Sequence, residues 1–145
     1  MKKNKKVTSR IEKLCAENGV KFTHQRRIIA EVISNSDDHP DANEVYLRAN
    51  KIDPRISLAT VYRTIKLFEE YNVLNRIELG GRRARYEELN EDEHHDHLID
   101  IDSGEIIEFV NEEIEKLQTK VAKKLGYELV DHRMELFGKK ILKKN

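Results

Sequence analysis

Four helix-start signals in the first sixty residues constrain the fold of this chain more than any other feature. Ser9, Thr23, Asp41 and Ser57 each stand directly before apolar residues at helical spacing. Their side-chain oxygens suit the N-cap position, where they accept hydrogen bonds from N–H groups that the helix leaves free. Ser9 and Asp41 also have a glutamate three residues later, the pattern of a capping box. The sequence therefore predicts four helices, the last over about 58–71.

Two short alternating runs follow these helices. Arg76–Leu79 and Arg83–Glu87 flank Gly80-Gly81, and paired glycines between such runs are typical of a β-hairpin. Helices followed by a hairpin predict a winged helix-turn-helix domain over residues 1–86.

The second half reads as a small α/β unit. Leu98–Ile101 and Glu105–Phe109 are predicted strands around an Asp-Ser-Gly turn. Residues 111–125 fit a helix, and Tyr127–Asp131 and Met134–Phe137 read as one or two further strands. The predicted inward side of that helix consists of Ile114, Leu117, Val121 and Leu125.

The predicted fold class is therefore α+β, with a linker over 87–93 and a second domain over 94–145. A unit of this size is marginal alone, so pairing with a second copy is the expected solution.

Composition excludes several classes of protein. No apolar run approaches the roughly 20 residues that span a bilayer, and no apolar segment follows the basic start, so neither a membrane protein nor a secretory signal is predicted. The single cysteine, Cys15, rules out an intrachain disulfide. We therefore expect a cytoplasmic protein.

The net charge is zero, with 27 basic and 27 acidic residues, but the two signs are unevenly placed. Residues 1–85 hold 18 basic and 11 acidic residues, a net of +7, and residues 86–145 hold 9 and 16, a net of −7. The basic half is compatible with phosphate contacts.

The predicted fourth helix has an outward face suited to DNA. It carries small, aromatic and basic residues, and no acid occurs from Ser57 through Phe68. Small residues allow close approach to a major groove, Tyr62 can contact thymine methyl groups, and Arg63 can reach guanine or phosphate. Near Gly80-Gly81, three arginines are expected to contribute affinity more than sequence choice: Arg82, Arg83 and Arg85. The residues predicted to bind DNA are Lys21, Arg26, Ser57, Ala59, Thr60, Tyr62 and Arg63.

Three of the six histidines fall within the tetrad His94-His95-Asp96-His97. An extended segment points successive side chains to opposite faces, so His95 and His97 would face one way and His94 and Asp96 the other. One segment could thus supply two separate metal sites. Imidazole and carboxylate ligands suit Fe(II), Mn(II), Co(II) or Zn(II).

These motifs together resemble the ferric uptake regulator family. The tetrad continues as Leu98-Ile99, the segment Ser57–Thr64 precedes it, and Gly104–Phe109 follows it, all in the family's order. The resemblance runs from about Gly19 to Gly138 and implies a homodimeric, metal-dependent repressor that binds a double-stranded DNA operator. It implies an N-terminal winged helix and a C-terminal α/β dimerisation domain.

The resemblance also implies two ligand sets, carried over position by position. The regulatory site, between the two domains in the family, corresponds to His39, Glu87, His95, His97 and Glu108. The second site, within the dimerisation domain, corresponds to His94, Asp96, Glu115 and His132. Glu88 adjoins Glu87 and is the alternative ligand at that position.

One departure from the family concerns zinc. Many members hold a structural zinc on two Cys-x-x-Cys pairs, where this chain has Asp100 and Ser103 and no later cysteine pair. The four-cysteine zinc site is therefore predicted to be absent. We expect Fe²⁺, or else Mn²⁺, at the regulatory site and a second divalent ion, Zn²⁺, Fe²⁺ or Mn²⁺, at the other.

The predicted function is an Fe²⁺-responsive transcriptional repressor of iron uptake and homeostasis genes, without enzyme activity and without a membrane or small organic substrate as partner. A manganese- or zinc-responsive repressor of the same family is the first alternative. A DNA-binding protein with purely structural metals is the second. A metalloenzyme is the third, although catalysis needs an open coordination position.

Overall fold

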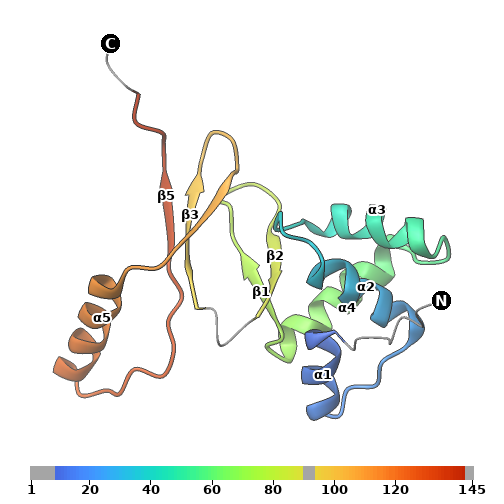
Figure 1. Ribbon diagram of the computed structural model, residues 1–145, viewed down its shortest axis with the longest axis horizontal. Helices are drawn as coiled ribbons and strands as arrows, with labels where there is room; N and C mark the ends of the chain where they lie inside the picture. The colour runs from blue at the N-terminus through green and yellow to red at the C-terminus, as the bar shows by residue number, and fades with distance from the viewer. Residues whose placement is uncertain (1–8, 90–93, 143–145) are drawn as a thin grey trace, which may run out of the picture. The chain divides into compact units, whose positions relative to one another are not determined.

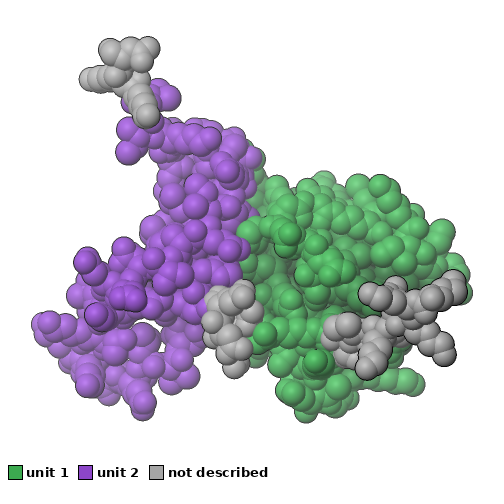
Figure 2. All heavy atoms as spheres, viewed as in Figure 1, with its two compact units in different colours: residues 1–89 green, residues 90–145 purple. Residues whose placement is uncertain are grey.

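The computed structural model describes residues 9–89 and 94–142. The chain divides into two compact units, residues 1–89 and 90–145 (Figure 2). The predicted α+β class is confirmed: helices dominate the first unit, and a small sheet with one helix forms the second (Figure 1). The predicted 87–93 linker begins inside the last strand of unit 1, and its residues 90–93 lie outside the described residues. None of the described helices is long and apolar enough to cross a membrane.

Unit 1 has four helices and a two-stranded hairpin. Its elements are α1 (Arg10–Glu17), α2 (His24–Ser34), α3 (Ala42–Ile52), α4 (Leu58–Glu70), β1 (Leu74–Ile77) and β2 (Arg85–Glu88). All four predicted N-caps are confirmed, since each side chain accepts a hydrogen bond from the backbone N–H three residues later.

The two predicted capping boxes differ. At α3 the box is complete, because Glu44 also reaches back to the N–H of Asp41. At α1 the Glu12 carboxylate instead accepts two hydrogen bonds from Arg27 of α2, at 3.0 and 3.1 Å. The glutamate that the local pattern assigns to a cap therefore links two helices.

The core of unit 1 lies where α2 contacts α1, α3 and β2, and where α4 contacts α3 and β1. Phe68 of α4 is fully buried and stacks on Phe22, with ring centroids 5.9 Å apart. Val61 and Ile65 lie on the same buried stripe of α4. Leu58, the first residue of α4, is 38% exposed.

The hairpin begins earlier than the sequence predicts. β1 covers Leu74–Ile77 and pairs with β2 in a register that sets Asn75 opposite Glu87. Residues 78–84 connect the strands, so Gly80 and Gly81, both at positive φ, lie inside a longer connection and do not form a two-residue turn. The register matters because it decides which side chains neighbour Glu87.

Unit 2 is a three-stranded sheet and one helix. β3 (Asp96–Asp100) lies between antiparallel β4 (Ile106–Phe109) and parallel β5 (Glu135–Gly138), and α5 spans Glu112–Lys124 (Figure 1). Of the one or two strands predicted over 127–131 and 134–137, one forms as β5, and the alternative of a second strand over 127–131 is wrong.

The predicted inward face of α5 is also wrong for a single chain, because none of its residues is buried. Leu117, Val121 and Leu125 are 60%, 49% and 70% exposed. Only Ile99 is a fully buried apolar residue among the described part of this unit. Unit 2 thus leaves an apolar surface that its own chain does not cover.

The turn before α4 yields a prediction about acid stability. Asp53 accepts hydrogen bonds from the Arg55 backbone and guanidinium, all at 3.0 Å, and these bonds hold the pKa of Asp53 below its usual value. A lowered folded-state pKa gives stability that is present above the unfolded pKa of about 3.9 and is lost as the pH falls. We expect Asp53→Asn to lower the melting temperature near neutral pH, and the gap from the unsubstituted protein to shrink well below pH 4.

The matched control is Asp37→Asn, which removes an exposed aspartate. Thermal unfolding followed by circular dichroism over this pH range measures both variants. A gap for Asp53→Asn that does not change with pH would contradict the account.

Candidate metal centre and nucleic-acid interface

The outward face of α4 carries the residues predicted to read DNA. Ala59, Tyr62 and Arg63 are exposed, and the Tyr62 side chain is 48% exposed although it is aromatic. Ser57 caps the helix by accepting a hydrogen bond from the Thr60 N–H at 3.1 Å, and the two hydroxyl oxygens lie 2.9 Å apart. Capping therefore uses part of the hydrogen-bonding capacity of Ser57 and Thr60. Of the residues of α4 predicted to bind DNA, Tyr62 and Arg63 have the long side chains.

Lys21 lies in the connection between α1 and α2, and Arg26 lies in the first turn of α2. The Arg26 guanidinium donates a hydrogen bond to the Lys21 carbonyl oxygen at 2.6 Å. This bond fixes the backbone at Lys21, while the Lys21 side chain is exposed. Both residues stand in unit 1 with α4.

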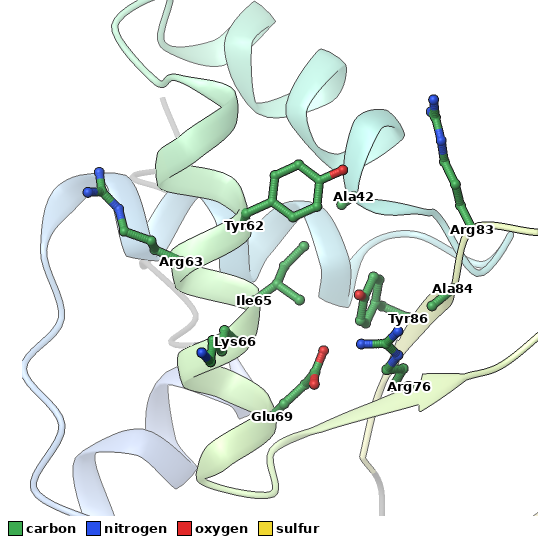
Figure 3. Close-up of a pocket in the computed structure, with 10 residues that line it drawn as sticks. All are labelled: Ala42, Tyr62, Arg63, Ile65, Lys66, Glu69, Arg76, Arg83, Ala84 and Tyr86. Carbon is green, nitrogen blue, oxygen red and sulfur yellow. The ribbon is translucent and has the colours of Figure 1, made fainter.

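A groove lies between α4 and the connection that follows β1, which we call the wing (residues 78–84). Its volume is about 500 Å³. Figure 3 shows its lining side chains, which come from α3, α4, β1, the wing and β2. The lining residues are Ala42, Tyr62, Arg63, Ile65, Lys66, Glu69, Arg76, Arg83, Ala84 and Tyr86.

Two of the predicted regulatory ligands meet inside unit 1. His39 Nε2 lies 3.1 Å from Glu87 Oε2, and the two side chains are 11% and 14% exposed. Asn75, opposite Glu87 in the hairpin, donates from Nδ2 to Glu87 Oε1 at 2.9 Å. One carboxylate oxygen is thus held by the hairpin while the other faces the imidazole. Of the two adjacent glutamates, it is Glu87 that faces His39.

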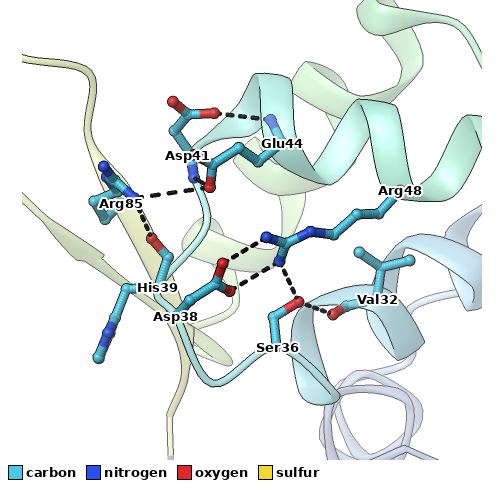
Figure 4. Close-up of polar contacts among 8 residues, drawn as sticks. All are labelled: Val32, Ser36, Asp38, His39, Asp41, Glu44, Arg48 and Arg85. Carbon is cyan, nitrogen blue, oxygen red and sulfur yellow. Dashed lines mark hydrogen bonds and ion pairs between the residues drawn. The ribbon is translucent and has the colours of Figure 1, made fainter.

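The loop that carries His39 is anchored from both sides (Figure 4). Arg48 of α3 donates to both carboxylate oxygens of Asp38 and to Ser36 Oγ, and Ser36 in turn donates to the Val32 carbonyl at 2.6 Å. Arg85 of β2 donates to the His39 carbonyl at 3.3 Å. His39 itself has a φ of 50°, a left-handed conformation that is uncommon for a non-glycine residue. These contacts fix the loop in that conformation.

In unit 2 the tetrad leads into β3, and its side chains divide between two groups. His94 and Asp96 lie with His132 and Glu115, and the four ligand atoms are all within 4.8 Å of one another. His94 Nε2 is 2.9 Å from His132 Nε2 and 3.4 Å from a Glu115 oxygen. Around an ion with ligand bonds of about 2.0–2.1 Å, tetrahedral ligand atoms lie about 3.3 Å apart. These four side chains could therefore hold one metal ion.

The Asp96 carboxylate tests whether this group fits a cation. Its side chain is 1% exposed, and neither oxygen accepts a hydrogen bond from any described residue. The same carboxylate lies 3.3 Å from His132 Nε2 and 3.7 Å from His94 Nε2. A buried carboxylate needs a counter-charge. A divalent cation bound by all four groups supplies it, so the residues fit a metal.

The other group in unit 2 consists of His95, His97 and Glu108. The imidazoles of His95 and His97 meet edge to face with centroids 4.9 Å apart, and His95 Nε2 lies 3.3 Å from a Glu108 oxygen. His97 stands opposite Glu108 in the β3–β4 register. The structure therefore brings together three of the five predicted regulatory ligands in unit 2, and His39 with Glu87 in unit 1.

Comparison with known proteins identifies the family to which this chain belongs. The sequence pattern of the Ferric uptake regulator family matches residues 17–137. A Ferric uptake regulation protein of Rhizobium leguminosarum bv. viciae is 50% identical over 132 residues, which cover 91% of this chain and 92% of that protein. This chain is a member of the ferric uptake regulator family, a family of metal-binding transcription regulators.

Two solved structures extend the comparison. A structure described as a zinc-bound manganese uptake regulator is 49% identical, with a TM-score of 0.69, and the match covers 90% of this chain and 98% of that one. The ferric uptake regulator of Pseudomonas aeruginosa with manganese is 32% identical, with a TM-score of 0.80 and the same coverage. With a single cysteine, this chain is of the type without a four-cysteine zinc site.

Sequence reasoning did not find the residues that orient the ligands. Asn75 was missed because the predicted hairpin began two residues late, which hid its position opposite Glu87. Arg48 was missed because its partner Asp38 lies ten residues away along the chain. Arg85 was expected only to add DNA affinity, and its bond to the His39 carbonyl was missed because a backbone partner leaves no signal in the sequence. The correct hairpin register would have identified Asn75.

The anchored loop yields a second prediction. Because the Arg48–Asp38 pair is well exposed, Arg48→Ala should cost less than about 1 kcal/mol of unfolding free energy. The same change should accelerate amide hydrogen exchange in residues 35–39, because Arg48 also holds Ser36. Lys51→Ala, on the same helix and exposed, is the matched control. Unchanged exchange in this loop would show that Arg48 does not fix it.

Proposed function

We propose that this protein is a metal-responsive DNA-binding repressor with Fe²⁺ as its effector, acting in the cytoplasm on iron uptake and homeostasis genes. The observation that carries the proposal is the division of the tetrad's side chains between two imidazole–carboxylate groups. The exposed face of α4 supplies the DNA-binding surface of the same chain.

The regulatory ion is proposed to take ligands from both units. His39 and Glu87 would come from unit 1, and His95, His97 and Glu108 from unit 2. The close His39–Glu87 and His95–Glu108 pairs support this, since in each the donor atoms already face one another. A metal bound by both pairs would restrict the DNA-binding unit. Metal can shift DNA affinity only by binding the DNA-competent arrangement more tightly.

The second ion is proposed to bind His94, Asp96, Glu115 and His132 within unit 2, and Zn²⁺, Fe²⁺ and Mn²⁺ all suit these ligands. Both proposed sets already hold four or more protein ligands, whereas a catalytic metal keeps an open position. A regulator is therefore proposed and not a metalloenzyme.

We also propose that the protein acts as a homodimer on a double-stranded operator. The exposed apolar residues of α5 and of the sheet in unit 2 support dimerisation, because burying them would supply the core that the single unit lacks. Two copies would then present two α4 helices to two half-sites.

Mn²⁺ is a second candidate for the effector. The 49% identity to a manganese uptake regulator specifically favours it. Nitrogen and oxygen ligands alone discriminate weakly between Fe²⁺ and Mn²⁺, so metal availability as well as affinity would decide.

A titration of operator binding with metal tests this proposal. Wild-type protein should bind operator DNA at least tenfold more tightly with Fe²⁺ or Mn²⁺ than with a chelator, whereas His39→Ala and His97→Ala should lose most of that gain. His24→Ala removes an exposed histidine outside both ligand groups and should behave as wild type.

Metal-independent operator binding by the unsubstituted protein would instead favour purely structural metals. The effector is the metal that promotes operator binding at the lower free concentration. The Fe²⁺ titration is carried out anaerobically.

The second site gives a separate prediction. Adding divalent metal should raise the melting temperature of the wild-type protein, because binding to the folded state alone contributes about 2.7 kcal/mol at 100 times Kd. Glu115→Gln should raise the metal concentration that is needed for this stabilisation about 10- to 100-fold. Glu113→Gln, on the same helix and outside the ligand group, should leave the metal response intact. Equal responses of the two variants would exclude Glu115 as a ligand.

A further inference from the structure

The groove between α4 and the wing contains charged residues that the regulatory account leaves unexplained. Lys66 and Arg76 line it from α4 and β1, and Arg83 lines it from the wing. One acid, Glu69, also lines it. A cavity of about 500 Å³ with a cationic lining in a DNA-binding unit suits an anionic group.

The acid faces one end of this groove. In Figure 3 the Glu69 carboxylate points from α4 towards Arg76 and Tyr86, whereas the Arg63 and Arg83 guanidinium groups point outwards. Burial raises the pKa of the Tyr86 hydroxyl, and the charge of Glu69 raises it further. Tyr86 therefore remains a neutral hydroxyl at this end of the groove. Glu69 partly neutralises the field of Arg76.

We propose that this groove binds one backbone phosphate of duplex DNA, with Arg76 and Lys66 as its cationic ligands and Glu69 as a counter-charge that limits the affinity. The inference rests on the proposed DNA-binding function and names a phosphate subsite apart from the base-reading face. A planar guanidinium matches phosphate oxygens with two hydrogen bonds, and an ammonium adds a point charge. Arg76 lines the groove with its side chain 47% exposed, and its Nε donates at 2.7 Å to Glu78, which lies outside the groove lining.

A phosphate subsite has a distinctive energetic signature. Phosphate carries no base identity, so the groove contributes equally on operator and non-operator duplexes. Neutralising one phosphate releases counterions, so each lost contact lowers the salt dependence of binding by about one unit of log–log slope. Glu69 acts in the opposite direction, since its charge repels the phosphate.

Two substitutions of opposite sign test the subsite in metal-loaded full-length protein. Arg76→Ala should weaken binding to operator and random duplexes alike by about tenfold and reduce the salt slope by about one. Arg76→Lys should recover part of the affinity, since it keeps the charge but not the planar fork. Glu69→Gln should strengthen binding to both duplexes several-fold, a gain that damage to the fold would not produce.

The controls are matched in charge. Lys51→Ala removes an exposed cation from α3, and Glu70→Gln removes the neighbouring acid, which does not line the groove. A duplex series with single uncharged methylphosphonates then locates the phosphate. At one position per half-site, the loss from Arg76→Ala and the loss from neutralising the phosphate should not add.

Additive losses at every position would overturn the proposal, as would equal gains from Glu69→Gln and Glu70→Gln. If inorganic phosphate shifts the NMR resonance of the Arg76 Nε–H but Arg76→Ala leaves DNA binding unchanged, the groove binds a free anion. That result would also overturn the proposal. These failures leave metal-dependent operator binding by the unsubstituted protein intact. Loss of that binding would refute the proposed function as well.

Discussion

The pleat of β3 is the constraint on which the metal chemistry of this chain depends. Successive side chains of an extended segment point to opposite faces, so four consecutive residues cannot all bind one ion. His94 and Asp96 accordingly lie with Glu115 and His132, and His95 and His97 lie near Glu108. β3 is paired on both edges, which fixes the opposite directions of its first two side chains, Asp96 and His97. The buried Asp96 carboxylate makes a bound cation the natural completion of its group.

β2 has the corresponding role in unit 1. Arg85 and Glu87 face the loop before α3, where they contact the His39 carbonyl and imidazole, while Tyr86 between them lines the groove beside α4. A single strand therefore joins the proposed metal ligands to the proposed phosphate subsite. Glu87, a proposed metal ligand, and Tyr86, which lines the groove, are adjacent residues on opposite faces of this strand.

Local signals accounted for most of the fold. The N-caps predicted α1 to α4 because capping depends on residues three positions apart, and the tetrad predicted two ligand faces because alternation is local as well. The hairpin register and the exposed face of α5 could not be read in this way. Register depends on how Val73 and Leu74 pack against the helices, and helical periodicity cannot say whether Leu117 and Val121 meet their own chain or another. Asn75, Arg48 and Arg85 depend on contacts between distant residues, so no short pattern reveals them.

The central claim is that metal binding and DNA binding are coupled, and thermodynamic linkage provides its most direct test. If metal tightens operator binding by some factor, operator must tighten metal binding by the same factor. Calorimetric titration of the chain with Mn²⁺, with and without a saturating operator duplex, measures this at equilibrium. We expect the operator duplex to tighten Mn²⁺ binding at the regulatory site by the same factor by which Mn²⁺ tightens operator binding. Equal Mn²⁺ affinity with and without DNA would contradict it.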